Sequence, residues 1–401
     1  MIQRKLAAML FIVTAYTGTV AFRLSMPAIA FYAKNVLEAS MLGIGLLTSS
    51  FFIARGITAI IAGGLTDKLG SKVLVASAAG FLLNALVVQL YPAVPNIYWL
   101  LLLRFVQGVL NGFAWVPIQA LLGFITSKNI RGRIYSIYFI LGALGALSGN
   151  LLYSVLSSAP LTRILMISSI FFIISGIEIV LAKSMIGENV SIDGRFEKRG
   201  EPSARHAVQT TILTIVPLIL VVLSSSMFSS ILKGDLIYVY LNVYLGLSRS
   251  AASLIIGFAG VIVLPVNYMI SWIADKKSSK TALEIALTMG ILGGLLLSTR
   301  NPLLAVPGLI LAMIGGSSIV PVTRKLAVSI RSYGGTSIGL INTSGNIGSM
   351  AGSAIAGLLF DRLGNIYLAG ELVLPMILMI LPLVIAIALV TLALKENFSE
   401  N

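Results

Sequence analysis

The sequence predicts an all-α membrane protein in which twelve transmembrane helices form two pseudo-symmetric six-helix bundles. Three observations support this fold class. The 401 residues are 57% hydrophobic and only 10% charged, whereas about a quarter of the residues in a soluble domain are charged. Apolar stretches close to the roughly 20 residues that a spanning helix needs occur twelve times. The loop motif around Asp67 also recurs around Asp275, 208 residues later, which indicates a duplicated membrane unit.

The twelve apolar stretches divide evenly about one charged linker. In chain order they cover residues 6–33, 41–64, 73–92, 97–126, 134–158, 163–183, 211–232, 250–273, 281–299, 302–323, 336–359 and 370–394. Residues 184–210 are rich in charged side chains with glycine and proline between them, which is typical of a solvated connection. We therefore expect an N-terminal six-helix bundle in residues 1–183, a cytoplasmic linker in residues 184–210 and a C-terminal six-helix bundle in residues 211–401.

The placement of charge predicts the orientation in the membrane. Most of the 28 Lys and Arg residues fall on segments that are cytoplasmic if both termini are inside, and the positive-inside rule favours that topology. We expect a multi-pass protein of the cell (plasma) membrane whose cytoplasmic face attracts anionic lipid headgroups. The net charge of +14 does not indicate a nucleic-acid partner, because no soluble domain interleaves basic and aromatic residues.

Catalytic and metal chemistry are not expected from this sequence. The chain has no cysteine, and its single histidine, His206, lies in the charged linker. One histidine cannot form a metal cluster, and the sequence holds no nucleophile–base set or phosphate-binding loop. We predict that the protein is not an enzyme and needs no cofactor.

The repeated loop motif predicts a gating element. Its first copy reads Gly63-Gly64-Leu65-Thr66-Asp67-Lys68-Leu69-Gly70-Ser71-Lys72, and its second copy places Asp275 and Lys280 at the matching positions. We expect the two leading glycines to let two helix backbones approach closely. We expect the aspartate to form a charged latch, with Arg131 as a natural partner, that closes in one conformation and parts in another. A tight turn with surface charges is the alternative interpretation.

A second pair of repeats lies later in each half. Gly145-x-x-x-Gly149 recurs as Gly348-x-x-x-Gly352 with an offset of 203 residues. This spacing places both glycines on one face of a helix, where they favour close helix packing.

The loop motif and the run Arg104-Phe105-Val106-Gln107-Gly108 resemble the major facilitator superfamily, and the resemblance covers nearly the whole chain. The second run is similar to the Arg-x-x-Gln-Gly signature of its drug/proton antiporter-like branch. Thr66 and Ser71 depart from the family's loop pattern, and the fifth stretch lacks the Gly-Pro of that branch. The resemblance implies a monomeric secondary transporter, an antiporter or symporter, with protons or another ion as the coupling partner.

Polar and charged side chains inside the predicted helices, which lipid cannot satisfy, and those in the loops at the helix ends define the candidate sites. The expected substrate-binding residues are Arg23, Arg104, Gln107, Asn111, Trp115, Lys233, Asn342 and Asn346. The expected coupling or gating residues are Asp235, Arg55, Asp67, Lys72, Arg131, Asp275 and Lys280. In the family the first, fourth and seventh helices line the cavity, so the resemblance implies that cations from both halves converge on an anionic substrate.

Two interpretations of these charges stay open. Arg23 and Lys233 either bind an anion, or Arg23 pairs with Asp235 and closes an outer gate. Arg55 is assigned to the latch with Asp67 and not to the substrate. Acidic residues near the expected cavity are few, and Asp235, just after the seventh stretch, is the one placed nearest to it. The first and fourth predicted helices carry no acid, so a cationic substrate is disfavoured.

The sequence therefore favours a secondary active transporter that moves a small anionic or amphipathic organic solute by rocker-switch alternating access. The first alternative is a proton-coupled multidrug efflux exporter, which the Arg-x-x-Gln-Gly run favours. An alternative of another class is a non-transporting membrane receptor or a lipid scramblase built on the same scaffold.

Overall fold

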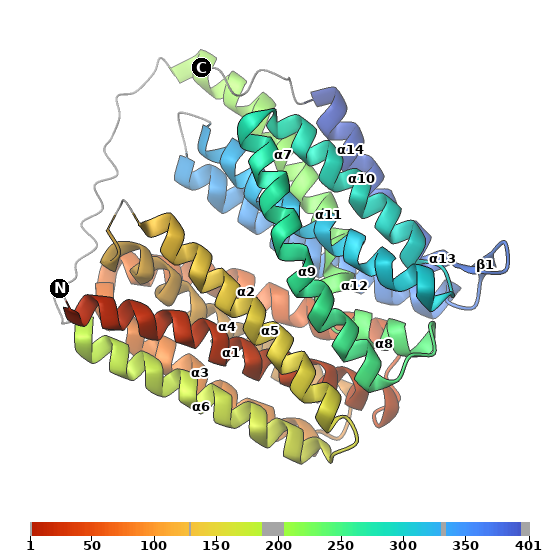
Figure 1. Cartoon of the computed structure of the whole chain (residues 1–401), viewed down its shortest axis with the longest axis horizontal. Helices are drawn as coiled ribbons and strands as arrows, with labels where there is room; N and C mark the ends of the chain where they lie inside the picture. The colour runs from red at the N-terminus through yellow and green to blue at the C-terminus, as the bar shows by residue number, and fades with distance from the viewer. Residues whose placement is uncertain (1, 128–129, 187–203, 330–333, 394–401) are drawn as a thin grey trace. The chain divides into compact units, whose positions relative to one another are not determined.

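The computed structural model describes residues 2–127, 130–186, 204–329 and 334–393, and nearly all of them are helical (Figure 1). The first half contains α1 (Ile2–Asn35), α2 (Met41–Leu69), α3 (Leu74–Leu90), α4 (Ile97–Ile125), α5 (Arg131–Leu156) and α6 (Leu161–Ile186). The second half contains α7 (Ala204–Lys233), α8 (Leu236–Val243), α9 (Arg249–Lys276), α10 (Ser279–Leu297), α11 (Pro302–Ser329), α12 (Gly334–Leu363), α13 (Leu374–Leu378) and α14 (Leu381–Ala393).

Short elements join some of these helices. The 3₁₀ turns η1 (Gly70–Val73) and η2 (Tyr91–Ala93) flank α3, and the two-residue strands β1 (Tyr367–Leu368) and β2 (Leu372–Val373) pair antiparallel before α13. At the α2–η1 junction Gly70 is buried and has a φ of +55°. A side chain is strained in this left-handed region, so a tight turn requires the glycine at position 70 of the loop motif.

The helices have the length and composition of membrane spans. Ten ranges of the described residues are long and apolar enough to cross a bilayer, and one of them, Met41–Ala93, contains both α2 and α3. The glycine- and serine-rich α12 is not among the ten. With α2 and α3 counted separately and α12 added, the described residues contain the twelve predicted segments. The predicted all-α membrane fold is confirmed.

The chain divides into two compact units. Unit 1 comprises residues 1–39, 50–196 and 247–261, and unit 2 comprises residues 40–49, 197–246 and 262–401. Residues 40–49, which include the start of α2, thus belong to unit 2. Residues 247–261, which include the first half of α9, belong to unit 1. The predicted linker falls largely on residues 187–203, outside the described residues, and the predicted domain boundaries stay a prediction.

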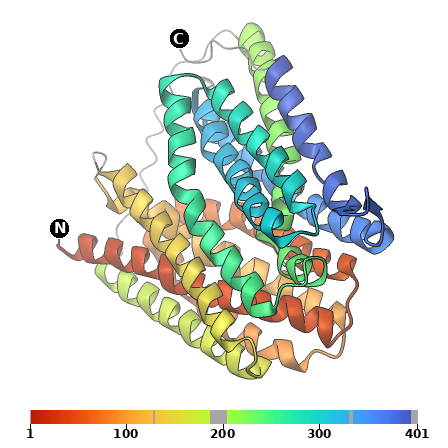
Figure 2. The same cartoon turned by 45° about the vertical axis from the view of Figure 1, so that its right-hand side comes forward.

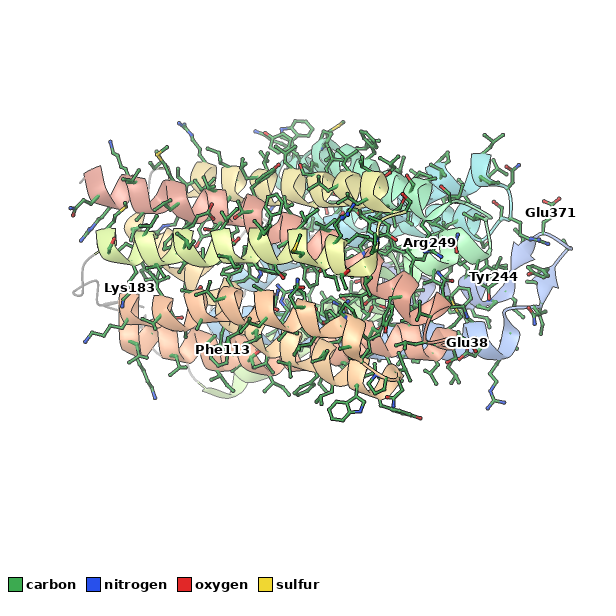
Figure 3. All side chains as sticks on the ribbon, turned by 90° about the horizontal axis from the view of Figure 1, so that it is seen from below. Glu38, Phe113, Lys183, Tyr244, Arg249 and Glu371 are labelled. Carbon is green, nitrogen blue, oxygen red and sulfur yellow. The ribbon has the colours of Figure 1, made fainter. Side chains whose placement is uncertain are left out.

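In unit 1, α1 packs against α5 and α6, and α3 packs against α4 and α6 (Figure 1). Glu38, which follows α1, and Lys183, near the end of α6, lie at opposite ends of these helices (Figure 3). Helix α6 therefore ends where α1 begins, as an even number of crossings requires. In unit 2, α10 packs along α11, and α7 packs against α12 and α14 (Figure 2).

The later glycine repeats explain the closest of these packings. A Cβ on Gly145 would collide with the carbonyl oxygen of Tyr16 in α1, and one on Gly149 would lie 2.7 Å from the carbonyl oxygen of Val20. In unit 2, Gly348 and Gly352 face the backbone of α7 in the same way, at Leu223 and Met227. The predicted close packing at both Gly-x-x-x-Gly repeats is confirmed.

The corresponding prediction for the loop motif is wrong. A Cβ on Gly63 would meet only Val116 Cγ1 at 4.0 Å, and a Cβ on Gly64 would meet nothing within 4 Å. These glycines lie at a half-exposed to exposed part of α2, where no second helix backbone approaches them among the described residues.

Candidate functional site

The polar face of α4 begins as a buried network. Arg104 and Gln107 are both 0% exposed. Arg104 Nη1 donates a hydrogen bond of 2.8 Å to Gln107 Oε1, and the hydroxyl of Tyr91 donates one of 3.0 Å to the same oxygen. The guanidinium also lies 5.8 Å from the ring centroid of Phe22 and 5.6 Å from that of Phe51. The Arg-x-x-Gln run therefore forms a closed cluster inside unit 1, in which the aromatic rings and an amide oxygen stabilise the cation.

Farther along α4 the polar face becomes more accessible. Asn111 is 6% exposed, whereas Trp115 and Gln119 are half-buried. The ring of Trp115 packs edge-on against Phe81 with the centroids 5.2 Å apart. Four residues of α4 were assigned to the substrate, and in the described part of unit 1 Trp115 is the one among them that is not buried.

Arg23 lies in α1 and is half-buried. Its Nη1 donates to the sulfur of Met26 at 3.5 Å, which is a weak, neutral acceptor. Within the described residues the guanidinium has no carboxylate partner. The proposed pairing with Asp235 joins residues of the two different units and stays a prediction.

Asp235 separates α7 from α8 in unit 2 and is 0% exposed. The Thr48 hydroxyl donates to its carboxylate at 2.8 Å, and the Asp235 backbone N–H donates to Thr48 Oγ1 at 2.9 Å. Lys233, two residues earlier, is half-buried. The start of α2 and the α7–α8 junction are therefore joined by a reciprocal pair of hydrogen bonds.

The two asparagines assigned to α12 differ in their surroundings. Asn342 is exposed and accepts a hydrogen bond of 3.1 Å from Arg324 Nη2 of α11. Asn346, one helical turn later, is half-buried. Their assignment to the substrate stays a prediction.

The structure does not bring together the residues of the predicted latch in unit 1. Asp67 is exposed and makes no hydrogen bond or ion pair within the described residues. Arg55 lies twelve residues earlier on the same helix, which is about 18 Å along its axis. Arg131 Nη2 donates instead to the carbonyl oxygen of Thr126 at 3.4 Å. Lys72, at the end of the motif, is exposed.

The second copy of the motif has the ion pair that the first copy lacks. Asp275 Oδ1 lies 2.8 Å from Lys325 Nζ of α11, and the same ammonium donates to the carbonyl oxygen of Ala274 at 2.6 Å. Lys280 Nζ donates to the carbonyl oxygen of Thr391 at 3.1 Å. The motif in unit 2 thus ties the end of α9 to α11.

Sequence reasoning missed a clasp at the start of α2. The carboxylate of Asp361, at the end of α12, accepts from the backbone N–H groups of Met41 at 2.7 Å and Leu42 at 2.9 Å. These N–H groups have no partner within a helix, and an acid stabilises the positive end of the helix dipole. The Phe360-Asp361-Arg362-Leu363-Gly364 run, a weak copy of the loop motif, was the available signal.

Tyr244 lies beside this clasp and outside the spanning segments. Its ring stacks on Tyr240 with centroids 5.3 Å apart and contacts Phe360 at 5.2 Å. Burial raises the pKa of Tyr244 to about 12, and the neighbouring Tyr367 and Asp361 act in the same direction. The phenol therefore stays neutral at physiological pH.

A buried carboxylate joins α1 to α6. Glu178 is 9% exposed, and its Oε2 accepts from the hydroxyls of Thr14 at 2.9 Å and Thr17 at 2.8 Å. Thr17 also shares a hydrogen bond of 2.8 Å with Ser175. Within the described residues the carboxylate has no cationic partner. The sequence around Glu178 could not predict its two threonine partners, because they lie on a different helix, α1.

The described residues contain no group of three or more His, Cys, Asp and Glu side chains that could hold a metal ion.

Comparison with known proteins assigns the family. The family model described as Major Facilitator Superfamily matches residues 8–353. The chain belongs to the Major Facilitator Superfamily. This confirms the resemblance seen in the loop and α4 motifs, and it makes the protein a multi-pass membrane transporter and not an enzyme. No curated protein matches the chain significantly.

Solved structures of superfamily members share the fold. One is the crystal structure of a mutant of the nucleoside transporter NupG, with a TM-score of 0.75 and 14% identity over 97% of this chain and 100% of that one. Another is a bacterial homologue of the human lysosomal transporter Spinster, solved in an inward-facing and occupied conformation. Its TM-score is 0.73 and its identity 15%, over 97% of this chain and 96% of that one. At such identities the likeness concerns the fold.

Proposed function

We propose that the protein is a secondary active transporter of the plasma membrane that moves a small anionic or amphipathic organic solute by rocker-switch alternating access. Both termini are cytoplasmic in this proposal, and protons or another ion are the coupling partner. Membership of the superfamily supports transport, and the two compact units support a mechanism based on a duplicated scaffold.

The observation that carries the anionic substrate is the environment of Arg23. A cation inside a spanning helix is costly in lipid and persists where it faces a partner or a water-filled path. Arg23 is half-buried and has only the sulfur of Met26 as a hydrogen-bond acceptor within the described residues. An anionic group of the solute would supply the missing counter-charge.

The proposal is tested by solute exchange in liposomes that contain the purified full-length chain. Radiolabelled carboxylates and phosphate esters are compared with uncharged molecules of the same size. We expect exchange of at least one anion, reduced at least tenfold in Arg23→Gln, because losing one partner of a charged hydrogen bond costs about 2 kcal/mol or more. Arg249→Gln is the matched control, since that guanidinium stacks over the Phe31 ring at 5.8 Å. Exchange of uncharged solutes alone would contradict the anionic class.

Proton-coupled multidrug efflux is the second candidate, and the buried Arg104–Gln107 pair favours it because it reproduces the Arg-x-x-Gln run of that branch. Efflux predicts that a proton gradient drives lipophilic drugs out of the vesicles and that Arg23→Gln retains this activity. Lipid transfer between leaflets without any solute exchange would support the scramblase alternative instead.

A further inference from the structure

A second intramembrane arginine, Arg55, lies at the midpoint of α2. Fourteen residues separate it from Met41 at one end of the helix and from Leu69 at the other. That distance is about 21 Å along the helix axis, more than half the roughly 30 Å hydrocarbon core. In a helix centred on the bilayer, the guanidinium therefore lies deeper in the hydrocarbon core than that of an arginine near a helix end, whose side chain extends to the headgroups.

Arg55 also lacks the partners that stabilise the other buried arginine of unit 1. Arg104 is enclosed by Phe22, Phe51 and the Gln107 amide. Arg55 is half-buried, and its side chain makes no hydrogen bond or ion pair within the described residues. The phenol of Tyr138 in α5 lies close enough to interact with it electrostatically. The side-chain donors of Arg55 are thus available to a ligand, whereas Arg104 Nη1 is already bonded to Gln107 within a fully buried cluster.

Tyr138 and Gln119 complete a cluster of donors from three helices of unit 1. The side-chain amide of Gln119, in α4, donates to Tyr138 Oη at 3.5 Å. The hydroxyl of Tyr135 donates to the backbone carbonyl of Gln119 at 2.6 Å, which fixes α4 against α5. Because the Tyr138 oxygen accepts from Gln119, its own hydrogen remains to be donated, and no acceptor for it lies within the described residues.

An oxyanion satisfies this arrangement. The guanidinium presents parallel N–H groups that match the two oxygens of a carboxylate or phosphate. A phenolic O–H beside it supplies a third donor to the same group. A neutral solute would leave the cation uncompensated inside a spanning helix, where an unpaired charge is costly.

We propose that Arg55 and Tyr138, with Gln119 orienting the phenol, form an oxyanion subsite that binds the carboxylate or phosphate of the solute. This assignment replaces the interpretation of Arg55 as part of the latch with Asp67. It rests on the proposed function for the identity of the ligand as a transported solute.

The test measures ligand stabilisation of the purified full-length protein in neutral detergent, because a ligand that binds the folded state raises its stability by mass action. The probes are two matched pairs, benzoate with benzamide and glucose 6-phosphate with glucose. We expect at least one anion to stabilise the protein more than its uncharged partner does. Its apparent affinity should fall at least tenfold in Arg55→Gln and several-fold in Tyr138→Phe. Arg55→Lys should retain part of it.

Lys68→Gln is the control, since it removes one positive charge from the same helix at an exposed position. Unchanged anion affinity in Arg55→Gln, or an equal loss in Lys68→Gln, would overturn the subsite. So would wild-type protein that does not distinguish either anion from its uncharged partner. If Arg55→Gln does not fold, Tyr138→Phe and Arg55→Lys give the same comparison.

Two further experiments distinguish a lipid headgroup from a soluble anion as the ligand, and a failure of the subsite from a failure of the proposed transport function. If micellar phosphatidylglycerol stabilises the protein through Arg55 and the soluble anions do not, the site holds a lipid headgroup and the solute assignment is wrong. Anion exchange in liposomes that survives Arg55→Gln with unchanged affinity refutes the subsite but leaves the transporter proposal intact. Anion binding that requires Arg55 without exchange of any solute supports the subsite and refutes the transporter proposal.

Discussion

The hydrogen bonds around Glu178 give a quantitative prediction about what holds α1 to α6. Its Oε2 accepts from Thr14 at 2.9 Å and from Thr17 at 2.8 Å, and the carboxylate is 9% exposed. Replacing both threonines with valine keeps their shape and removes both donors. The carboxylate then remains buried with no donor from α1, and the free energy of unfolding should fall.

The size of the loss follows from the charge on the acceptor. A hydrogen bond to a charged group contributes about 1.5–3 kcal/mol, against about 0.5–1.5 kcal/mol for a neutral pair. Each hydroxyl has one hydrogen, and that of Thr14 also lies 2.9 Å from the carbonyl oxygen of Leu10, so the lower end of the range applies. We expect the double substitution Thr14→Val and Thr17→Val to lower the free energy of unfolding by about 3 kcal/mol. The loss cannot exceed the free energy needed to protonate the carboxyl, because a buried carboxylate without donors takes up a proton instead.

A double-mutant cycle with Glu178→Gln measures the charged part. Free energies of unfolding are measured by denaturant titration of the purified variants in mixed micelles. In the Glu178→Gln background the two valine substitutions should cost about half as much, because the acceptor is neutral. Thr323→Val is the control, since that hydroxyl is 0% exposed and bonds only to carbonyls of its own helix. Equal losses in both backgrounds would refute a charge-assisted contact between α1 and α6.

Three further predictions concern packing and surface charge. Gly145→Ala should destabilise the protein by about 1–3 kcal/mol, because its methyl collides with the α1 backbone, whereas Gly64→Ala should be neutral or stabilising in thermal unfolding. Asp361→Asn should cost about 0.5–1 kcal/mol in the same assay by weakening the cap on α2, and a loss unchanged by high salt would contradict a charge effect. Asp275→Asn should cost less than about 1 kcal/mol, since Lys325 and Asp275 are 41% and 65% exposed, and a larger loss in denaturant titration would show a stronger contact.

The fold was predictable because its causes are local in the sequence. Apolar length predicts a spanning helix, and Gly145 and Gly149 share a helix face wherever that helix packs. The glycines of the loop motif failed as predictors for the same reason. Gly63 and Gly64 mark a place where a second helix could approach, but only the packing of the whole bundle decides whether one does.

The candidate site was less predictable because the partner of a polar side chain is set by distant segments. Arg55 and Arg104 are the same residue type in two spanning helices, and the local sequence shows only that Arg104 has Gln107 one turn later. Arg104 is enclosed by rings from α1 and α2, whereas Arg55 faces a phenol from α5. The threonine donors of Glu178 lie more than 160 residues away along the chain, beyond any local pattern.

The two units repeat the packing and not the charge, and this difference bears on where the solute is recognised. Each bundle needs glycines where two of its helices approach closely. Gly348 therefore faces the backbone of α7 as Gly145 faces that of α1. Arg55 has Val263 at the 208-residue offset, and the ion pair of Asp275 has no counterpart at Asp67 within the described residues. Duplication thus accounts for the scaffold, while the charges that differ between its copies are the residues through which we expect a solute to be distinguished.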